Sequence, residues 1–188
     1  MKEFELFWMC NNLDQITRFH NHVHGFFNDN LQESQVSDEI NQQQRNWLKN
    51  EYEVHLPNQL RKSVFLTMFG HFEECLHASW QSAGKPDCLK SAYGINRYSS
   101  FLSKYLGIDI GSNPSYGYIK DCQLVRNAII HIAGRVSLSK DNTKLESVVR
   151  RNKDCFEIVH DRIYLTNEGI SKFQRSVAQF TKEIVVAI

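Results

Sequence analysis

Hydrophobic residues recur along most of this chain at the spacing of α-helices. Over residues 2–27 apolar positions return every three or four residues, which predicts a long amphipathic helix. The polar cluster at residues 28–30 is expected to end this helix. Its apolar stripe consists of Leu6, Met9, Leu13, Ile16, His20, Val23 and Phe27.

A proline separates the next two predicted helices. Ser37 or Asp38 can cap a polar helix that begins at Glu39, and Pro57 is expected to interrupt it. A third helix is expected at about residues 58–82, where apolar side chains again recur at helical spacing.

Two further helices are expected before the chain changes character. Asp87 can cap a fourth helix that runs to about Leu106, before Gly107 stops it. A fifth, central helix is expected from Ser115 or Tyr116 to Ala133, where Gly134 ends it.

The last part of the chain combines helices with a small sheet. A short helix is expected at residues 141–151, and the alternation from Phe156 to Leu165 around a tight turn predicts a β-hairpin. Thr166 can cap a final amphipathic helix. We therefore predict an all-α fold, an antiparallel helical bundle with a minor β-hairpin near the C-terminus, as a single domain over residues 1–188.

The central helix has an unusual cross-section. One apolar stripe consists of Val125, Ile129, Ile132 and Val136. The opposite side carries Gln123, Asn127, Ile130 and Gly134, flanked by Arg126 and His131. Because a solvated face would carry several charged residues, and Arg126 is the one formal charge between Leu124 and Gly134, this helix is expected to be buried on both sides.

Composition narrows the class of function. The 22 Lys and Arg nearly balance the 21 Asp and Glu, so the chain lacks the overall charge of a protein that binds nucleic acid tightly. A local basic rim is still available from Arg126, Arg135, Arg150, Arg151 and Lys153. Five cysteines without a CxxC pair indicate reduced thiols, and neither a membrane span nor a signal peptide is evident, so a cytoplasmic protein is expected.

Two segments contain histidines that could bind a metal or take part in acid–base catalysis. His20 and His24 lie one helical turn apart, but His20 falls on the apolar stripe and no carboxylate or cysteine completes a ligand set, so no metal site and no cofactor are expected. The third helix carries His71, Glu73, Glu74 and His77. A Glu near a His can do acid–base work, although such residues more often form a solvated face or an ion pair.

Arg126, Asn127 and His131 suggest a specific reaction. An Arg fork binds phosphate, and a His transfers protons near neutral pH, which together suffice for metal-free RNA cleavage by the 2′-hydroxyl. The leaving 5′-oxygen also needs a proton, which a second His131 in a two-fold dimer would supply. Ile130 would give that contact apolar area, and Gly134 would allow close approach.

The stretch Arg126-Asn-Ala-Ile-Ile-His131 resembles the Arg-polar-x3-His signature of HEPN domains, the higher eukaryotes and prokaryotes nucleotide-binding superfamily. The sequence-specific part of the resemblance is confined to residues 122–136. It implies a helical bundle that dimerises through the Tyr116–Ala133 helix and acts as a metal-independent endoribonuclease in toxin–antitoxin, abortive-infection or CRISPR-linked defence. By position, Arg126 and His131 would be catalytic and Asn127 would orient them. One subfamily has a modified Tyr where this chain has Ala133, so that regulation is not implied.

Two other functions stay open at this point. The chain could be a non-catalytic HEPN module that binds RNA, a nucleotide or a partner protein such as an antitoxin, which its near-neutral charge favours. It could also be a purely structural bundle in which these polar residues form buried hydrogen bonds.

Overall fold

The computed structural model describes residues 2–36 and 40–188. Its elements, in chain order, are α1 (Lys2–Val36), α2 (Gln42–Asn50), the π-helical η1 (Glu51–His55), α3 (Leu56–Ser82), the 3₁₀ segment η2 (Gly94–Tyr98), the π-helical η3 (Phe101–Tyr105), α4 (Pro114–Ile132), the 3₁₀ segment η4 (Val136–Leu138), α5 (Asn142–Arg151), β1 (Phe156–Val159), β2 (Arg162–Leu165) and α6 (Asn167–Ala187). The predicted all-α fold with a minor hairpin near the C-terminus is confirmed.

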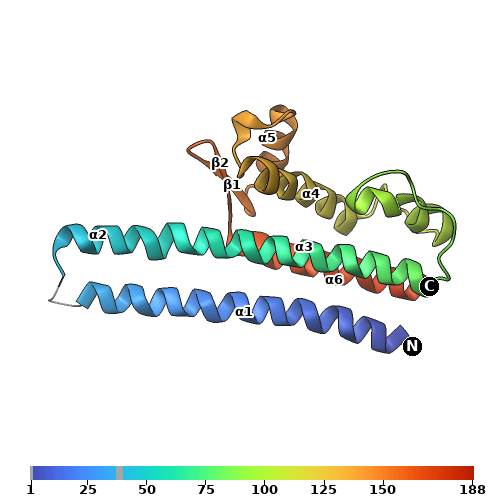
Figure 1. Cartoon of the computed structure of the whole chain (residues 1–188), viewed down its shortest axis with the longest axis horizontal. Helices are drawn as coiled ribbons and strands as arrows, with labels where there is room; N and C mark the ends of the chain where they lie inside the picture. The colour runs from blue at the N-terminus through green and yellow to red at the C-terminus, as the bar shows by residue number, and fades with distance from the viewer. Residues whose placement is uncertain (1, 37–39) are drawn as a thin grey trace.

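Three long helices form the base of the molecule, and the rest is built on one side of it. α1, α3 and α6 lie side by side, while α4, α5 and the hairpin rise above α3 and α6 (Figure 1). α1 runs antiparallel to α3, and α6 runs in the same direction as α3 (Figure 1). α4 packs on α6 and α3, so its position depends on this helical layer.

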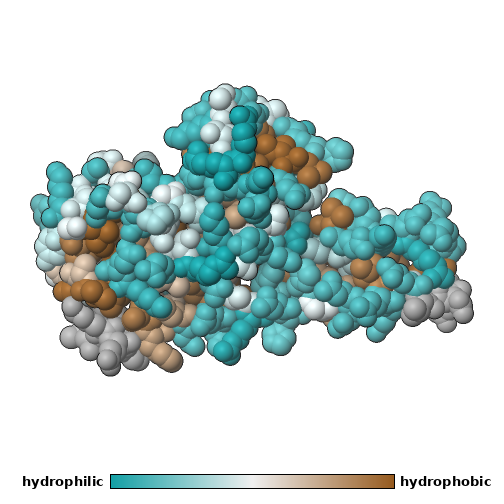
Figure 2. Space-filling view, turned by 180° about the vertical axis from the view of Figure 1, so that it is seen from behind, coloured by the Kyte–Doolittle hydropathy of each residue, from teal (hydrophilic) through white to brown (hydrophobic). Residues whose placement is uncertain are grey.

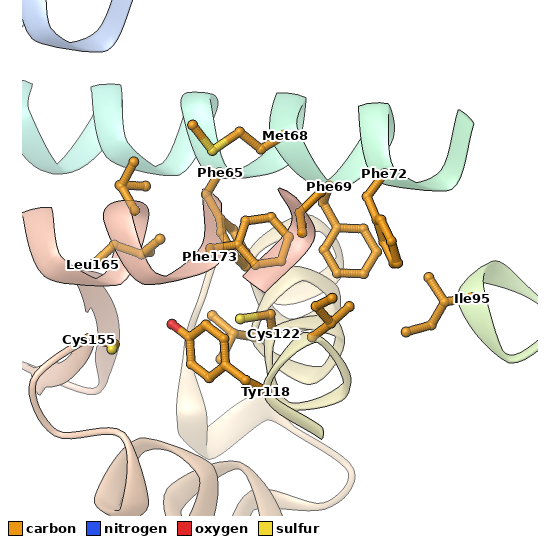
Figure 3. Packing of buried hydrophobic residues seen from close by; sticks show 14 of the residues in the cluster. Phe65, Met68, Phe69, Phe72, Ile95, Tyr118, Cys122, Cys155, Leu165 and Phe173 are labelled. Carbon is orange, nitrogen blue, oxygen red and sulfur yellow. The ribbon is translucent and has the colours of Figure 1, made fainter. Parts of the chain in front are cut away.

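Aromatic side chains from α3 and α6 make up the centre of the core. The rings of Phe65 and Phe173 have centroids 5.0 Å apart, and those of Phe69 and Phe173 are stacked at 5.7 Å. Cys122 of α4 is fully buried against this cluster, and Ile95 of η2 closes one end of it (Figure 3). The core thereby fixes α4 along its inner face.

The first helix is longer than predicted. The cluster at residues 28–30 does not end α1, which continues to Val36. The Asn30 side-chain amide donates to the carbonyl oxygen of Phe26 at 2.8 Å, so this polar residue bonds back onto its own helix. The prediction of an end at residue 28 was therefore wrong.

Pro57 does not interrupt the helical chain either, because α2, η1 and α3 follow one another without a break. In the π-helical η1 the Leu56 N–H bonds to the carbonyl oxygen of Glu51, five residues back. Because Pro57 has no N–H to donate, it fits at the first turn of α3, directly after this wider turn. α2 begins at Gln42 with a capping box on Asn41, while the expected caps at residues 37 and 38 lie outside the described residues.

The fourth predicted helix is wrong in its first half. The chain from Asp87 to Tyr93 is irregular, and helical turns appear only in η2 and η3. Gly94 takes a φ of +58°, a left-handed conformation that breaks any helix running through this point. Gly107, with φ +68°, does end the segment after Leu106 as predicted.

In the C-terminal half the elements lie close to the positions predicted from the sequence. Asn113 caps α4, Asp141 caps α5 and Thr166 caps α6, each by accepting a hydrogen bond from a backbone N–H in the first turn. The hairpin pairs Phe156 with Leu165 and Val159 with Arg162 in antiparallel register. These elements confirm the prediction to within a residue or two.

The face of the molecule seen from behind is mainly polar, with separate apolar areas (Figure 2). Seen from behind, brown apolar residues show on the lobe above the helical layer and again at the end that carries the C-terminus (Figure 2). The five cysteines are free. No helix within residues 2–36 or 40–188 is long and apolar enough to cross a membrane.

A matched pair of glycine substitutions tests how α6 meets the hairpin. A Cβ on Gly169 would lie 2.5 Å from the carbonyl oxygen of Cys155, whereas a Cβ on Gly70 of α3 would meet nothing within 4 Å. We expect Gly169→Ala to lower the free energy of unfolding by about 1–3 kcal/mol, because backbone must move. Gly70→Ala should raise it by about 0.5–1 kcal/mol, because alanine favours the helix. Urea denaturation followed by far-UV circular dichroism measures both, and equal stability of the two variants would contradict this packing.

Candidate functional site

Both ends of α4 are tied to other parts of the fold. At its start the Asn113 side chain accepts from the Tyr116 N–H at 2.9 Å and donates to a Glu183 carboxylate oxygen of α6 at 2.6 Å. At its end Ala133 and Gly134 both take positive φ, +51° and +74°. The Ile163 N–H of β2 then donates to the Gly134 carbonyl oxygen at 2.9 Å. Both ends of α4 are therefore fixed, which defines the positions of the side chains on its outer face.

That outer face is open in the single chain, contrary to the expectation that α4 is buried on both sides. Val125 is fully buried and Ile129 and Ile132 are partly buried, so the predicted core stripe is in place. Ile130, however, is 46% exposed, and His131 is exposed.

Gly134 does not belong to the open face of α4. It is buried against the backbone of Ile163, which an added Cβ would approach to 3.6 Å. Its expected role in close approach to a partner is therefore wrong, because the chain's own hairpin already covers it.

Arg126 is held between three neighbours. Its Nη1 donates to the Asn127 Oδ1 at 3.1 Å, and its Nη2 lies 3.8 Å from the Glu73 Oε2. The guanidinium carbon lies 5.8 Å from the centre of the Phe69 ring. The arginine fork is therefore oriented by its chain neighbour and by two residues of α3.

Arg126, Asn127 and His131 border one cavity of about 540 Å³. This size falls within the range of about 300–1,000 Å³ that small-molecule sites occupy. We call it the arginine cavity, and its walls come from α3, η2 with the loop before it, and α4: Phe69, Glu73, Ala92, Tyr93, Gly94, Asn96, Gln123, Arg126, Asn127 and His131. The three residues singled out in the sequence thus share one site.

A second cavity of about 510 Å³ shares Asn127 and His131 with the arginine cavity. Its walls are mostly apolar, including Leu124, Ile132, Leu138 and Leu145, with Lys140 and Asp141 at the edge. His131 is therefore bordered both by the arginine cavity and by this more apolar one.

Gly94 determines the shape of the arginine cavity. A Cβ at this position would lie 2.9 Å from the Gln123 Nε2 and 3.2 Å from the Glu73 Oε1, and its φ of +58° disfavours any side chain. The missing side chain leaves room for both polar groups to turn toward the loop. Sequence reasoning did not bring Glu73 and Gly94 into the site, since helical periodicity carries no signal for contacts between distant segments.

Some of the basic residues clustered in the sequence are engaged in ion pairs. Arg151 Nε donates to an Asp121 carboxylate oxygen at 2.7 Å, and this contact raises the pKa of Arg151. Arg135 lies 3.9 Å from an oxygen of Asp161, whose pKa is lowered mainly by hydrogen bonds from Ser137. Two of the five basic side chains are therefore paired with aspartates.

The histidines of the first and third helices have local roles. His20 is 5% exposed, burial lowers its pKa, and its Nδ1 lies 3.1 Å from the side-chain oxygen of Asn21. His71 bonds to the Met9 carbonyl oxygen at 2.8 Å, and His77 lies 3.2 Å from the Tyr98 hydroxyl. Among the residues that the structure describes, no three His, Cys, Asp or Glu side chains gather as metal ligands.

Comparisons of this chain with protein-family models, with curated proteins and with solved structures found no match.

The stability of site variants separates a structural role for these residues from a functional one. Arg126→Ala and His131→Ala should each change the free energy of unfolding by no more than about 1 kcal/mol, because both side chains are at least partly solvated. Val125→Ala, one position away on the buried face, should cost about 2 kcal/mol. If Arg126→Ala and His131→Ala instead lose as much unfolding free energy as Val125→Ala in a denaturant titration, these side chains have a structural role.

Proposed function

We propose that this protein is a metal-independent endoribonuclease of HEPN type. The observation that supports it best is that Arg126, oriented by Asn127, lines one cavity together with His131. Within the described part of the chain His131 makes no hydrogen bond or ion pair, so its ring nitrogens are available to a substrate. An arginine fork beside an available imidazole combines a phosphate clamp with a proton-transfer group.

The reaction needs no nucleophile from the protein. A base takes the proton of the RNA 2′-hydroxyl, the 2′-oxygen attacks the adjacent phosphorus, and the bond from phosphorus to the 5′-oxygen breaks. Arg126 stabilises the charge that develops on the phosphorane oxygens, and an acid gives a proton to the leaving 5′-oxygen. The products are a 2′,3′-cyclic phosphate and a 5′-hydroxyl. His131 serves as one of the two proton-transfer groups, and His131 of a second copy can serve as the other.

The substrate of this proposal is single-stranded RNA. Tyr93 is 96% exposed on the wall of the arginine cavity, where an aromatic ring can stack on an unpaired base. Such an enzyme acts on RNA in the cytoplasm, where the five free cysteines would stay reduced. A role in a toxin–antitoxin or other defence system follows from the HEPN resemblance, with an antitoxin as the partner that holds the activity in check.

One observation favours the alternative of a non-catalytic module. The Glu73 carboxylate lies 3.8 Å from the Arg126 guanidinium and competes with a phosphate for it. In that case the cavity would bind RNA, a nucleotide or a protein partner without cleaving it.

RNA cleavage in the presence of EDTA tests the proposal. The wild-type protein should cut single-stranded RNA and leave 2′,3′-cyclic phosphate ends. Arg126→Ala and His131→Ala should each lower the rate by about 10²-fold or more, as expected when an oxyanion-stabilising or acid–base group is lost. Gel analysis of labelled RNA, with chemical identification of the ends, gives the result.

The matched controls are Arg18→Ala and His22→Ala, the same substitutions at exposed positions of α1. Both should cleave at the wild-type rate. Cleavage that requires a divalent metal, or that survives loss of Arg126 and His131, would refute the proposal. Binding of RNA that depends on Arg126 without any cleavage would favour the non-catalytic module.

The proposed homodimer through the outer face of α4 has its own test. Ile130 is 46% exposed on that face, and a glutamate there would place charge in the contact. Ile130→Glu should convert the dimer to a monomer in light scattering at micromolar concentration. Ile158→Glu, at a position 42% exposed on β1, should stay dimeric. A wild-type protein that is already monomeric would exclude this dimer.

A further inference from the structure

The Glu73 carboxylate is placed across the arginine cavity from α4. It comes from α3, and its side chain is 29% exposed, as is that of Arg126. The 3.8 Å from its Oε2 to the Arg126 Nη2 is longer than a hydrogen bond. No residue that the structure describes donates a hydrogen bond to this carboxylate, so its oxygens are free to accept a proton from a ligand in the cavity.

Gly94 keeps that carboxylate accessible. The Glu73 Oε1 lies where a Cβ on residue 94 would be only 3.2 Å away, so any side chain there would press on it. The loop therefore passes closely over Glu73 and still leaves the cavity open at this point. His131 lines the same cavity from α4.

We infer that Glu73 is the second proton-transfer group of the cavity, so that each chain carries a complete acid–base pair for RNA cleavage. This inference rests on the proposed function and names a further catalytic residue for it. Glu73 accepts the proton of the RNA 2′-hydroxyl while the 2′-oxygen attacks phosphorus. The bond from phosphorus to the 5′-oxygen breaks, and protonated His131 gives its proton to that oxygen. Exchange of protons with water restores both side chains.

Arg126 has two functions in this arrangement. In the empty cavity its Nη2 lies 3.8 Å from the Glu73 Oε2. A bound phosphate takes the fork of Arg126, and the 2′-hydroxyl next to that phosphate is then brought toward Glu73. The carboxylate that competes with phosphate in the empty cavity is thus the base that the bound substrate needs.

Among the described residues, the charged and titratable neighbours of the two groups come from α3, α4, the loop before η2, η2 itself and the turn before α5. Glu73 lies 3.8 Å from Arg126 of α4 and lines the cavity together with Tyr93 of that loop. Tyr98 of η2 also interacts with it, and burial raises the pKa of that tyrosine. His131 shares the arginine cavity with Glu73, Tyr93 and Arg126, and shares the second cavity with Lys140 and Asp141.

The sign of the pH dependence follows from the assigned roles. Glu73 works only as the carboxylate, so the rate falls on the acid side, where this group takes up a proton. His131 works only when protonated, so the rate falls on the alkaline side, where the imidazole loses its proton. In a mechanism with two histidines, the loss of activity on the acid side would not depend on residue 73.

Substitution of Glu73 with a matched neighbour as control tests the inference. Glu73→Gln should lower kcat/KM for single-stranded RNA by about 10²-fold or more, and the remaining activity should no longer fall at low pH. Glu73→Asp should have reduced activity that still falls at low pH. Glu74→Gln, at a side chain 63% exposed that lies beside His71, should cleave at the wild-type rate with an unchanged profile.

The outcomes separate this inference from the proposed function. If Arg126→Ala and His131→Ala abolish cleavage but Glu73→Gln keeps the wild-type rate and pH profile, Glu73 is not the base and the ribonuclease assignment stands. If Glu73→Gln slows cleavage but the rate still falls at low pH as in the wild type, the carboxylate only positions Arg126, and the inference is overturned. If the wild-type protein cuts no RNA, both the function and the inference fall.

Discussion

The packing of α4 on the aromatic core of α3 and α6 is the contact on which the rest of the molecule depends. Phe69 connects the two, because it stacks on Phe173 in the core and its ring also lies beside the Arg126 guanidinium. The same helix contact that excludes water from Val125 sets how far Arg126 stands from Glu73. Burial of a few apolar side chains, at about 1.5–3 kcal/mol each, therefore fixes the geometry of a polar site whose own contacts are much weaker.

The sequence alone predicted the parts of this fold that local chemistry determines. Caps at Asp141 and Thr166, the stop after α4 and the hairpin near residue 160 all follow from side chains within a few residues. The errors occurred where tertiary packing or an irregular helix overrides the local signal. The π-helical segment before Pro57 is such a case, since it removes the conflict that a proline creates in a regular α-helix.

The candidate site was predictable to the same extent. Asn127 and His131 lie one helical turn apart, which their spacing shows, whereas Arg126 and His131 are separated by about 140° around the helix axis. Glu73, Tyr93 and Gly94 reach the cavity only through the packing of α3 and the path of an irregular loop. The sequence also predicted a second buried side for α4, where the single chain leaves Ile130 and His131 exposed.

The Arg126–Glu73 contact is weak for an ion pair, and the proposed phosphate site depends on that weakness. A partly solvated ion pair at 3.8 Å contributes about 0–1 kcal/mol, whereas a bidentate bond from arginine to phosphate is among the stronger polar contacts in proteins. A phosphate can therefore displace the carboxylate from the guanidinium at small cost. By contrast, Arg151 is bonded to Asp121 through two nitrogens, and Asn152 also donates to Asp121 at 3.0 Å. That arginine joins α5 to α4, while Arg126 makes one hydrogen bond to Asn127 and a longer contact with Glu73.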